Sequence, residues 1–351
     1  MSQPLYINVR FLKENLTGVG RFGYEVSLRL KKALPQAVFL GPKGISDHYA
    51  QELGIQTFGR WSGVLWEQVE LPFYLKGKGG ILLNLANTCP ILYSQNVTVI
   101  HDIIPITNPE WFSFQARNYY KYISPLSIRH SKHLLTVSEQ TKQEISKLFH
   151  IDPNKIDVVY NATSDFWKKD MNSESPEFPF ILGVSSLDPR KNLKRLVEAF
   201  CQLNNKELRL VIVGHKHKAF PDLNIHLKEE EEKRILFKGY LTDQELRLLY
   251  SRAELFVFPS LKEGFGIPPL EAMKCGCPVV ASNIPSINEV CGDAVLYINP
   301  LDASSLARGM QQVLDDSVLK EKMVQKGNQR ASLFNWDSTS HKIVALLSSI
   351  I

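Results

Sequence analysis

The sequence predicts an α/β protein built from two doubly wound parallel-sheet domains. Short apolar segments alternate with longer amphipathic segments through both halves, which is typical of a parallel sheet with crossover helices. The 351 residues exceed one ordinary domain and suit two. A polar stretch with charge clusters and two prolines, residues 164–179, separates the halves. We therefore expect an N-terminal domain over residues 1–172, a C-terminal domain over residues 173–334 and a last amphipathic segment over residues 335–351.

The composition is that of a soluble globular protein, with 44% hydrophobic and 22% charged residues. No apolar run approaches the length that spans a bilayer, and the first residues lack the basic-then-apolar pattern of a signal peptide. We therefore expect a cytoplasmic protein. The five cysteines include no C-x-x-C pair, and Cys275 and Cys277 are too close for a usual zinc site. They are expected to be reduced core thiols.

The net charge of +5 lies entirely in the N-terminal half. Residues 1–160 hold 17 Lys+Arg and 12 Asp+Glu, whereas residues 161–351 hold 24 of each. Within the basic half, residues 114–133 carry four Lys/Arg, two histidines and three tyrosines without an acid, a mixture that favours an anionic membrane surface. A solvated helix face broken near Pro125 is the alternative. Nucleic acid is disfavoured, because the chain contains no base-reading motif.

The first glycine-rich segment follows an apolar strand and opens a helix. Gly18, Gly20 and Gly23 match the dinucleotide pattern G-x-G-x-x-G. A dehydrogenase of this kind needs an acidic residue at the end of the second strand for the ribose hydroxyls. That strand, within residues 37–44, contains no acid. We therefore disfavour a dehydrogenase and expect these glycines to form an anion-binding helix start.

His101 and Asp102 follow the apolar segment that ends at Ile100. Residues at the carboxyl ends of parallel strands face the ligand crevice of a doubly wound sheet. The pair is therefore a candidate for the active site, and a hydrogen-bonded structural pair is the alternative.

The second half begins with a strand, a turn and a helix start over residues 180–193. Arg190 and Lys191 lie in the turn. Two cations at a helix N-terminus oppose the helix dipole unless an anion is bound there. Arginine offers a planar fork to phosphate oxygens, and lysine offers a compact charge. We therefore expect a phosphate site, with a solvated basic pair as the alternative.

A second glycine-rich turn connects an apolar strand to a helix near residue 267. Glu263 and Glu271 lie at its two ends, and Gly264 and Gly266 lie between them. Glycines allow a ligand close to the backbone, and the N-terminus of a helix beginning near Ile267 attracts an anion. An anion site with a carboxylate on each side suits a ligand with a diphosphate core and hydroxyls at both ends. A nucleotide sugar has that form.

These motifs resemble those of the retaining glycosyltransferase family 4, which has the GT-B fold of two Rossmann-like domains facing a cleft. The resemblance rests on Glu263-x7-Glu271 with Gly264-Phe265-Gly266, and on Arg190-Lys191. It implies that residues 1–172 bind the acceptor, that residues 173–334 bind the nucleotide sugar, and that the helix over residues 335–351 crosses back onto the N-terminal domain. It also implies that Arg190 and Lys191 stabilise the leaving diphosphate, while Glu271 binds the ribose and Glu263 the hexose. The catalytic residues that it implies are His101, Asp102, Arg190, Lys191 and Glu263. The implied nucleotide-sugar-binding residues are Gly18, Gly20, Ser185, Tyr240, Leu241, Gly264, Phe265, Gly266, Ile267, Leu270 and Glu271.

The resemblance also implies a mechanism. The nucleotide base packs beside Tyr240, and His101 contacts the transferred sugar. Retention proceeds by attack on the front face, and Asp102 stays open as an alternative nucleophile. Because the chain contains no D-x-D motif, we expect a metal-independent enzyme without a cofactor.

Residues 105–112, which follow His101 and Asp102, are similar to bacterial mannosyltransferases of surface-polysaccharide assembly. This similarity implies GDP-mannose as donor and a lipid-linked saccharide as acceptor, with the enzyme peripheral at the inner face of the membrane. A UDP-glucose or UDP-N-acetylglucosamine transferase with a soluble acceptor is the alternative. A catalytically silent nucleotide-sugar-binding subunit is the alternative of another class.

Overall fold

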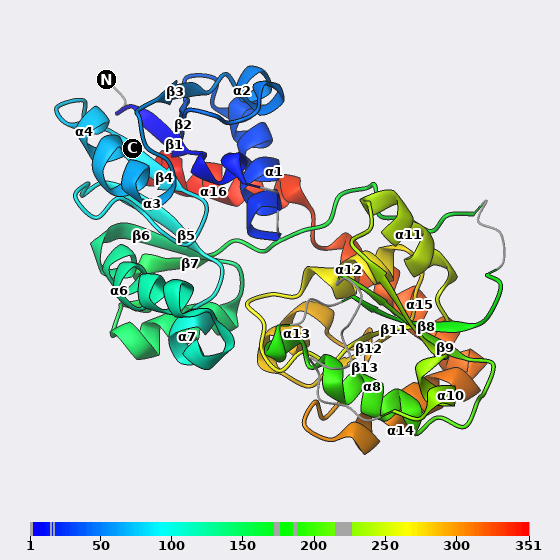
Figure 1. Ribbon diagram of the computed structural model, residues 1–351. Helices are drawn as coiled ribbons and strands as arrows, with labels where there is room; N and C mark the ends of the chain where they lie inside the picture. The colour runs from blue at the N-terminus through cyan, green and yellow to red at the C-terminus, as the bar shows by residue number, and fades with distance from the viewer. Residues whose placement is uncertain are drawn as a thin grey trace. The chain divides into compact units, whose positions relative to one another are not determined.

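In the computed structural model the chain forms two compact α/β units (Figure 1). The structure describes residues 3–14, 16, 18–171, 176–184, 188–214 and 227–350. Unit 1 comprises Met1–Ala162 and Asn335–Ile351, and unit 2 comprises Thr163–Phe334.

Within the described residues, unit 1 contains a seven-stranded parallel sheet in the order β3-β2-β1-β4-β5-β6-β7. Strand β1 pairs with β2 on one side and with β4 on the other, so the order reverses at β1 and β4. A crevice for ligands is expected at the carboxyl ends of these two strands. The strands are β1 (Leu5–Asn8), β2 (Val38–Pro42), β3 (Gln56–Phe58), β4 (Ile81–Asn84), β5 (Asn96–Ile100), β6 (Ser131–Thr136) and β7 (Ile156–Val158).

Helices flank this sheet, and the last helix of the chain packs against α1 of the same unit. The ring of Phe22 in α1 lies 5.8 Å from that of Trp336 in α16, and both side chains are buried. The helices are η1 (Arg10–Lys13), α1 (Gly18–Ala33), α2 (Asp47–Leu53), α3 (Gly63–Leu65), η2 (Trp66–Glu70), α4 (Leu71–Leu75), α5 (Ile104–Thr107), η3 (Pro109–Trp111), α6 (Phe114–His130), α7 (Glu139–Phe149), η4 (Pro153–Lys155) and α16 (Trp336–Ile350).

Unit 2 contains a six-stranded parallel sheet, counted over its described residues, in the order β10-β9-β8-β11-β12-β13. In Figure 1, α8 and α14 lie on one side of the sheet, and α11, α12 and α15 lie on the other. The strands are β8 (Phe180–Val184), β9 (Arg209–Val213), β10 (Ile235–Gly239), β11 (Leu255–Phe258), β12 (Val279–Ser282) and β13 (Leu296–Ile298). The helices are η5 (Pro189–Lys191), α8 (Leu193–Cys201), α10 (Glu229–Glu232), α11 (Asp243–Arg252), α12 (Ile267–Lys274), α13 (Pro285–Cys291), α14 (Ala303–Asp315) and α15 (Ser317–Ser332).

The boundary between the units lies ten residues before the predicted one. Residues 163–171 were expected in the first domain and its linker, but they pack against unit 2. The buried Trp167 ring lies 5.9 Å from that of Tyr250, and Arg247 pairs with Asp170 at 3.2 Å. Burial of the indole outweighs the polar composition of this stretch, because an aromatic side chain contributes a large apolar area.

Helix α6 runs through Pro125 and is not broken there, contrary to the alternative considered for residues 114–133. Proline costs a helix interior about 3 kcal/mol, because it removes one hydrogen bond and crowds the preceding turn. The helix continues because Ser127 and Ile128, in the following turn, are buried, and Ile128 belongs to a core cluster of unit 1. The last residues of the basic segment, from Ser131, belong to strand β6.

None of the helices that the structure describes is both long and apolar enough to cross a membrane. All five cysteines are free thiols, and four of them are buried.

Candidate active site

The two cations predicted to bind phosphate lie in the short turn between β8 and α8. The carboxylate of Asp188 caps this turn by accepting from the Arg190 backbone N–H at 3.1 Å. Asn192 ends the turn in the left-handed conformation and is buried. Its side-chain amide donates to the carbonyls of Pro259 at 3.0 Å and Pro300 at 2.7 Å. Asn192 therefore ties the cationic turn to the loop that follows β11.

Glu263 lies in that loop and pairs with both cations. Its Oε1 accepts from Lys191 Nζ at 2.6 Å, and its Oε2 accepts from Arg190 Nη1 at 3.1 Å. Arg190 Nε also donates to Asp188 at 2.7 Å. The Glu263 side chain is 8% exposed, against 21% and 17% for Arg190 and Lys191. Burial by itself raises the pKa of Glu263, but the charges of Lys191 and Arg190 outweigh it and lower that pKa below its ordinary value. The carboxylate is therefore ionised at neutral pH.

The glycine-rich turn continues from Glu263 into α12. Gly266 precedes the helix with φ of 103°, a conformation that L side chains rarely adopt. A Cβ at this position would lie 2.4 Å from Ile287 Cδ1. Gly266 is therefore required by its backbone angle and by the close packing of α13. Ile267 begins the helix, and because Pro268 and Pro269 carry no N–H, the backbone donors at this helix start are those of Gly266 and Ile267.

The other predicted residues of this segment are largely buried. Phe265 packs its ring 5.6 Å from that of Phe334, and Leu270 lies in the core, as does the backbone of Gly264. Glu271 is 8% exposed, and the hydroxyl of the buried Tyr250 donates to its Oε2 at 3.5 Å. Glu271 is thus held inside α12 at the far end of the turn from Glu263.

Tyr240 and Leu241 follow the edge strand β10. Tyr240 is 82% exposed and Leu241 is half-buried. Strand β10 lies three strand positions from β11, or about 14 Å at the usual strand spacing. The candidate residues of unit 2 follow the carboxyl ends of strands β8, β10 and β11, which is the edge where ligands bind in such sheets. Ser185 lies outside the described residues.

His101 and Asp102 follow β5 in unit 1, as the sequence predicts. The His101 ring is 4% exposed, lies 4.9 Å edge-on to Phe22, and bonds through Nε2 to the carbonyl of Leu85 at 3.0 Å. Burial lowers its pKa to about 4, so the imidazole is neutral and Nε2 carries the donated hydrogen. Asp102 accepts from the N–H of Ile104, the first residue of α5, at 3.0 Å. The two side chains have separate partners within unit 1.

Gly18 begins α1 and is exposed, whereas Gly20 lies in the first turn of the helix and is buried. Gly23 has a packing role, because a Cβ there would lie 2.4 Å from the ring of Phe11. The third glycine of the dinucleotide pattern therefore reflects contact with the preceding η1 segment.

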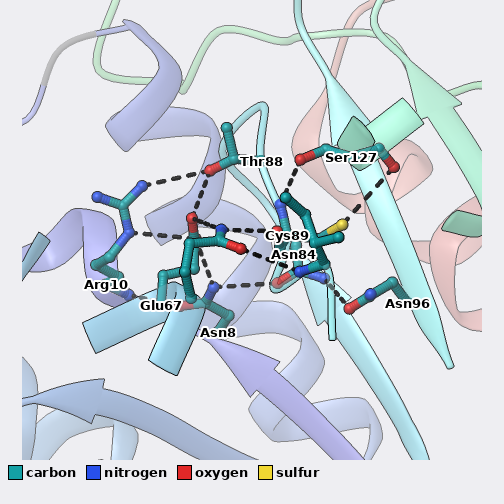
Figure 2. A network of polar contacts seen from close by, with 10 residues as sticks. Asn8, Arg10, Glu67, Asn84, Thr88, Cys89, Asn96 and Ser127 are labelled. Carbon is teal, nitrogen blue, oxygen red and sulfur yellow. Dashed lines mark hydrogen bonds and ion pairs between the residues drawn. The ribbon is translucent and has the colours of Figure 1, made fainter. Parts of the chain in front are cut away.

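A buried polar network in unit 1 was not predicted from the sequence. Glu67 is 1% exposed and accepts hydrogen bonds from Asn8, Arg10 and Thr88 (Figure 2). Asn8 also donates to Asn84 at 3.0 Å. The available signal was weak: Asn8 and Asn84 are polar residues that end the adjacent strands β1 and β4.

Arg10 of this network lines a cavity of about 190 Å³ at the carboxyl ends of β1 and β4. Gly20 and Tyr120 also line it. The structure thus brings together Arg190, Lys191 and Glu263 in unit 2, and Gly20 with Arg10 in unit 1. Across the described ranges, no cluster of His, Cys, Asp or Glu has the arrangement of a metal site.

Comparison with known proteins shows the family to which the chain is similar. The model of the family "Glycosyl transferases group 1" matches residues 165–330. The chain is 31% identical over 237 residues to the O-antigen chain mannosyltransferase RfbU of Salmonella typhimurium, covering 68% of this chain and 65% of that protein. It is 33% identical over 263 residues to O-antigen chain mannosyltransferase B of Escherichia coli, covering 71% and 68%. The matches span about two thirds of the length of these relatives.

The fold is also that of solved glycosyltransferase structures. The chain superposes on the structure of Anabaena Alr3699/HepE in complex with UDP and glucose with a TM-score of 0.75. The identity is 18%, and the match covers 99% of this chain and 100% of that chain. The predicted GT-B architecture is therefore confirmed. The 33% identical relative, 68% of which is covered, and the family match show that the chain belongs to the glycosyl transferases group 1 family.

Proposed function

We propose that this protein transfers a mannosyl residue from GDP-mannose to a saccharide acceptor in surface-polysaccharide synthesis. The observation that carries the proposal is the pairing of Glu263 with Arg190 and Lys191 beside the glycine-rich turn. The choice of mannose is supported by the names of the two O-antigen mannosyltransferases that the chain resembles.

The cations and the carboxylate have complementary roles in this proposal. When the bond between the sugar and the diphosphate breaks, negative charge develops on the diphosphate, and preorganised cations stabilise it. Arg190 and Lys191 bind those oxygens, and the backbone N–H groups of Gly266 and Ile267 at the start of α12 add further donors. Glu263 then exchanges cationic partners for sugar hydroxyls and faces the positive charge on the sugar. Glu271 accepts hydrogen bonds from the ribose.

We propose that transfer retains the anomeric configuration. In a front-face mechanism the leaving phosphate takes the proton of the attacking hydroxyl, and no protein nucleophile is needed. The binding of Asp102 to the N–H of Ile104 supports a structural role for that carboxylate. Proton NMR of the product tests this proposal, because α-linked product from GDP-α-mannose agrees with retention and β-linked product contradicts it.

We also propose that transfer requires no metal ion, since Arg190 and Lys191 supply the positive charge. Activity unchanged by EDTA is the expected result. Loss of activity with EDTA, and its return with Mg²⁺ or Mn²⁺, would overturn this point.

The proposed acceptor is linked to a lipid, and the enzyme meets it at an anionic membrane. Helix α6 supports this proposal, because Phe114 and Tyr122 are exposed together with Arg117, Lys121 and Arg129. Such aromatic and basic side chains bind the interface of anionic bilayers. Flotation with phosphatidylglycerol vesicles should recover the protein, and Arg117→Glu/Lys121→Glu should not float. Equal flotation of both proteins would show that α6 does not bind the membrane.

The donor is tested by a thermal-shift screen of nucleotide sugars, followed by transfer from radiolabelled GDP-mannose. A bound donor raises the melting temperature by mass action. GDP-mannose is expected to give the largest shift and to release mannose slowly without acceptor. A larger rise in melting temperature with UDP-glucose or UDP-N-acetylglucosamine would identify that nucleotide sugar as the donor in place of GDP-mannose. A shift without hydrolysis or transfer by any donor would indicate a binding protein.

A further inference from the structure

The buried carboxylate of Glu67 connects Arg10 to the interior of unit 1. Glu67 Oε1 accepts from Asn8 Nδ2 at 3.0 Å and from Arg10 Nε at 3.2 Å, and its Oε2 accepts from the Thr88 hydroxyl at 2.8 Å (Figure 2). A buried charge is tolerated only with such partners. Gln68 Nε2 also donates to Glu67 Oε2 at 3.3 Å, and because four groups hold the carboxylate, the carboxylate in turn fixes the position of the guanidinium.

The backbone around Glu67 has a specific geometry that places it inward. Helices α3 and α4 are joined by the π-helical turn η2, in which the Leu71 N–H donates to the carbonyl of Trp66, five residues earlier. Pro72 follows directly, and its ring would crowd the carbonyl four residues before it in a regular helix. The wider turn relieves this crowding, and such turns are frequent at functional sites. The buried Trp66 donates to the Phe58 carbonyl at 3.0 Å and anchors the turn.

Arg10 faces a cavity that Glu67 does not reach. Arg10 and Glu67 both line a small space of about 10 Å³, and Arg10, unlike Glu67, also lines the cavity of about 190 Å³. The guanidinium uses Nε for Glu67 and Nη2 for Thr88, at 3.4 Å. In the described part of the chain Nη1 makes no hydrogen bond. Arg10 therefore has a donor left for a ligand in the larger cavity.

The other walls of the cavity suit a sugar. Glu14 provides acceptors, the Tyr120 hydroxyl both donates and accepts, and the Phe11 ring provides an apolar face. Glu67 neutralises the charge of Arg10 and Glu14 adds a negative charge, so the lining does not favour a phosphate. The volume corresponds to about six water molecules at roughly 30 Å³ each, which suits one sugar ring better than a nucleotide.

We propose that Arg10 binds hydroxyl groups of a neutral sugar ring of the acceptor in this cavity, and that Glu67 is the positioning residue that holds Arg10 there. The inference rests on the proposed function, because it assigns the cavity to the acceptor of that transfer.

The test compares Arg10→Met, Glu67→Gln and the double variant with wild-type protein. Kinetics are measured with GDP-mannose and a panel of octyl glycosides that includes α-mannoside and β-N-acetylglucosaminide. Loss of a charged hydrogen bond should raise the acceptor KM about tenfold or more, while the donor KM changes less than about twofold. Arg29→Met is the matched control, since Arg29 pairs with Glu25 and Asp337 in the same unit but does not line the cavity. Its acceptor KM should equal that of wild type.

Non-additivity distinguishes positioning from a merely structural role. If Glu67 acts through Arg10, the double variant should have the acceptor KM of Arg10→Met alone. Independent, additive effects would refute the positioning role, and so would a fall in melting temperature with an unchanged KM. Glu67→Asp, which keeps the charge, should restore part of the affinity.

The test of acceptor binding by Arg10 and Glu67 can succeed or fail independently of the test of GDP-mannose as donor. If wild-type protein transfers no sugar from GDP-mannose, the proposed donor fails, and binding of the same octyl glycosides is measured by saturation-transfer NMR. Weaker binding to Arg10→Met and Glu67→Gln than to wild type and Arg29→Met supports the inference. Equal binding to all four proteins, or no glycoside binding to wild type, overturns it.

Discussion

Removing the charge of Glu263 should separate binding of the nucleotide diphosphate from transfer of the sugar. In Glu263→Gln, Arg190 and Lys191 lose their shared partner but keep their places, since Arg190 still pairs with Asp188 at 2.7 Å. Breaking a buried ion pair by removing one partner costs about 3–5 kcal/mol. Because Arg190 and Lys191 are 21% and 17% exposed, we expect the free energy of unfolding to fall by about 3 kcal/mol, the low end of this range.

The activity and the affinity of this variant should change differently. The kcat should fall on the order of 10²-fold, because a group facing the transition-state charge is lost. GDP should bind at least as tightly as to wild type, since the carboxylate no longer competes for the cations. GDP at 100 times its Kd would add about 2.7 kcal/mol, which offsets most of the lost stability.

Two assays decide the matter: transfer from radiolabelled GDP-mannose, and melting curves with and without GDP. Glu229→Gln is the matched control, because Glu229 pairs with Lys233 at 2.6 Å on an exposed helix face. Such a pair contributes less than about 1 kcal/mol, so kinetics and stability should stay near wild type. Near-normal turnover in Glu263→Gln, or a marked loss of GDP affinity, would refute the assigned role.

Three further predictions concern His101, Asn192 and Gly266. His101 has a folded pKa of about 4 against about 6.5 when unfolded, so the unfolded chain binds more protons between these values. The free energy of unfolding should therefore fall by about 2 kcal/mol from pH 7 to pH 5, because His101 takes up a proton when the chain unfolds. In urea unfolding, His101→Phe should show a fall that is smaller by this amount. Asn192→Ala leaves two buried carbonyls without their donor and should lower the unfolding free energy by about 2–4 kcal/mol, measured by denaturation; a change below about 1 kcal/mol would contradict the contact. Gly266→Ala forces φ of 103° on alanine and crowds Ile287, so calorimetry should show weaker GDP binding and a stability loss of about 1–3 kcal/mol, whereas wild-type values for both would be unexpected.

The alternation of strands and helices was readable from the sequence because it is a local property. Apolar runs marked β5 and β11, so His101 and Glu263 were correctly placed after strands. The glycine-rich turn before α12 was readable for the same reason, since glycine torsions and a helix start near Ile267 depend on neighbouring residues.

Long-range packing decided other features against local preference. Helix α6 continues through Pro125 because the next turn is buried, and residues 163–171 join unit 2 because Trp167 is buried there. Local propensity contributes tenths of a kcal/mol to a few kcal/mol, and burial of large side chains can exceed it.

The sequence by itself determined the architecture of two parallel sheets, the family motifs and the cationic and acidic candidates of unit 2. Only the tertiary structure decided which side chains meet. Glu263 contacts cations 72 and 73 residues away, and Glu67 reaches Asn8 across 59 residues. Strand order brings such residues together, and strand order is a non-local property that no short pattern encodes. Glu67 had no signal in the sequence, because a carboxylate in an amphipathic helix resembles a solvated one until its partners are in place.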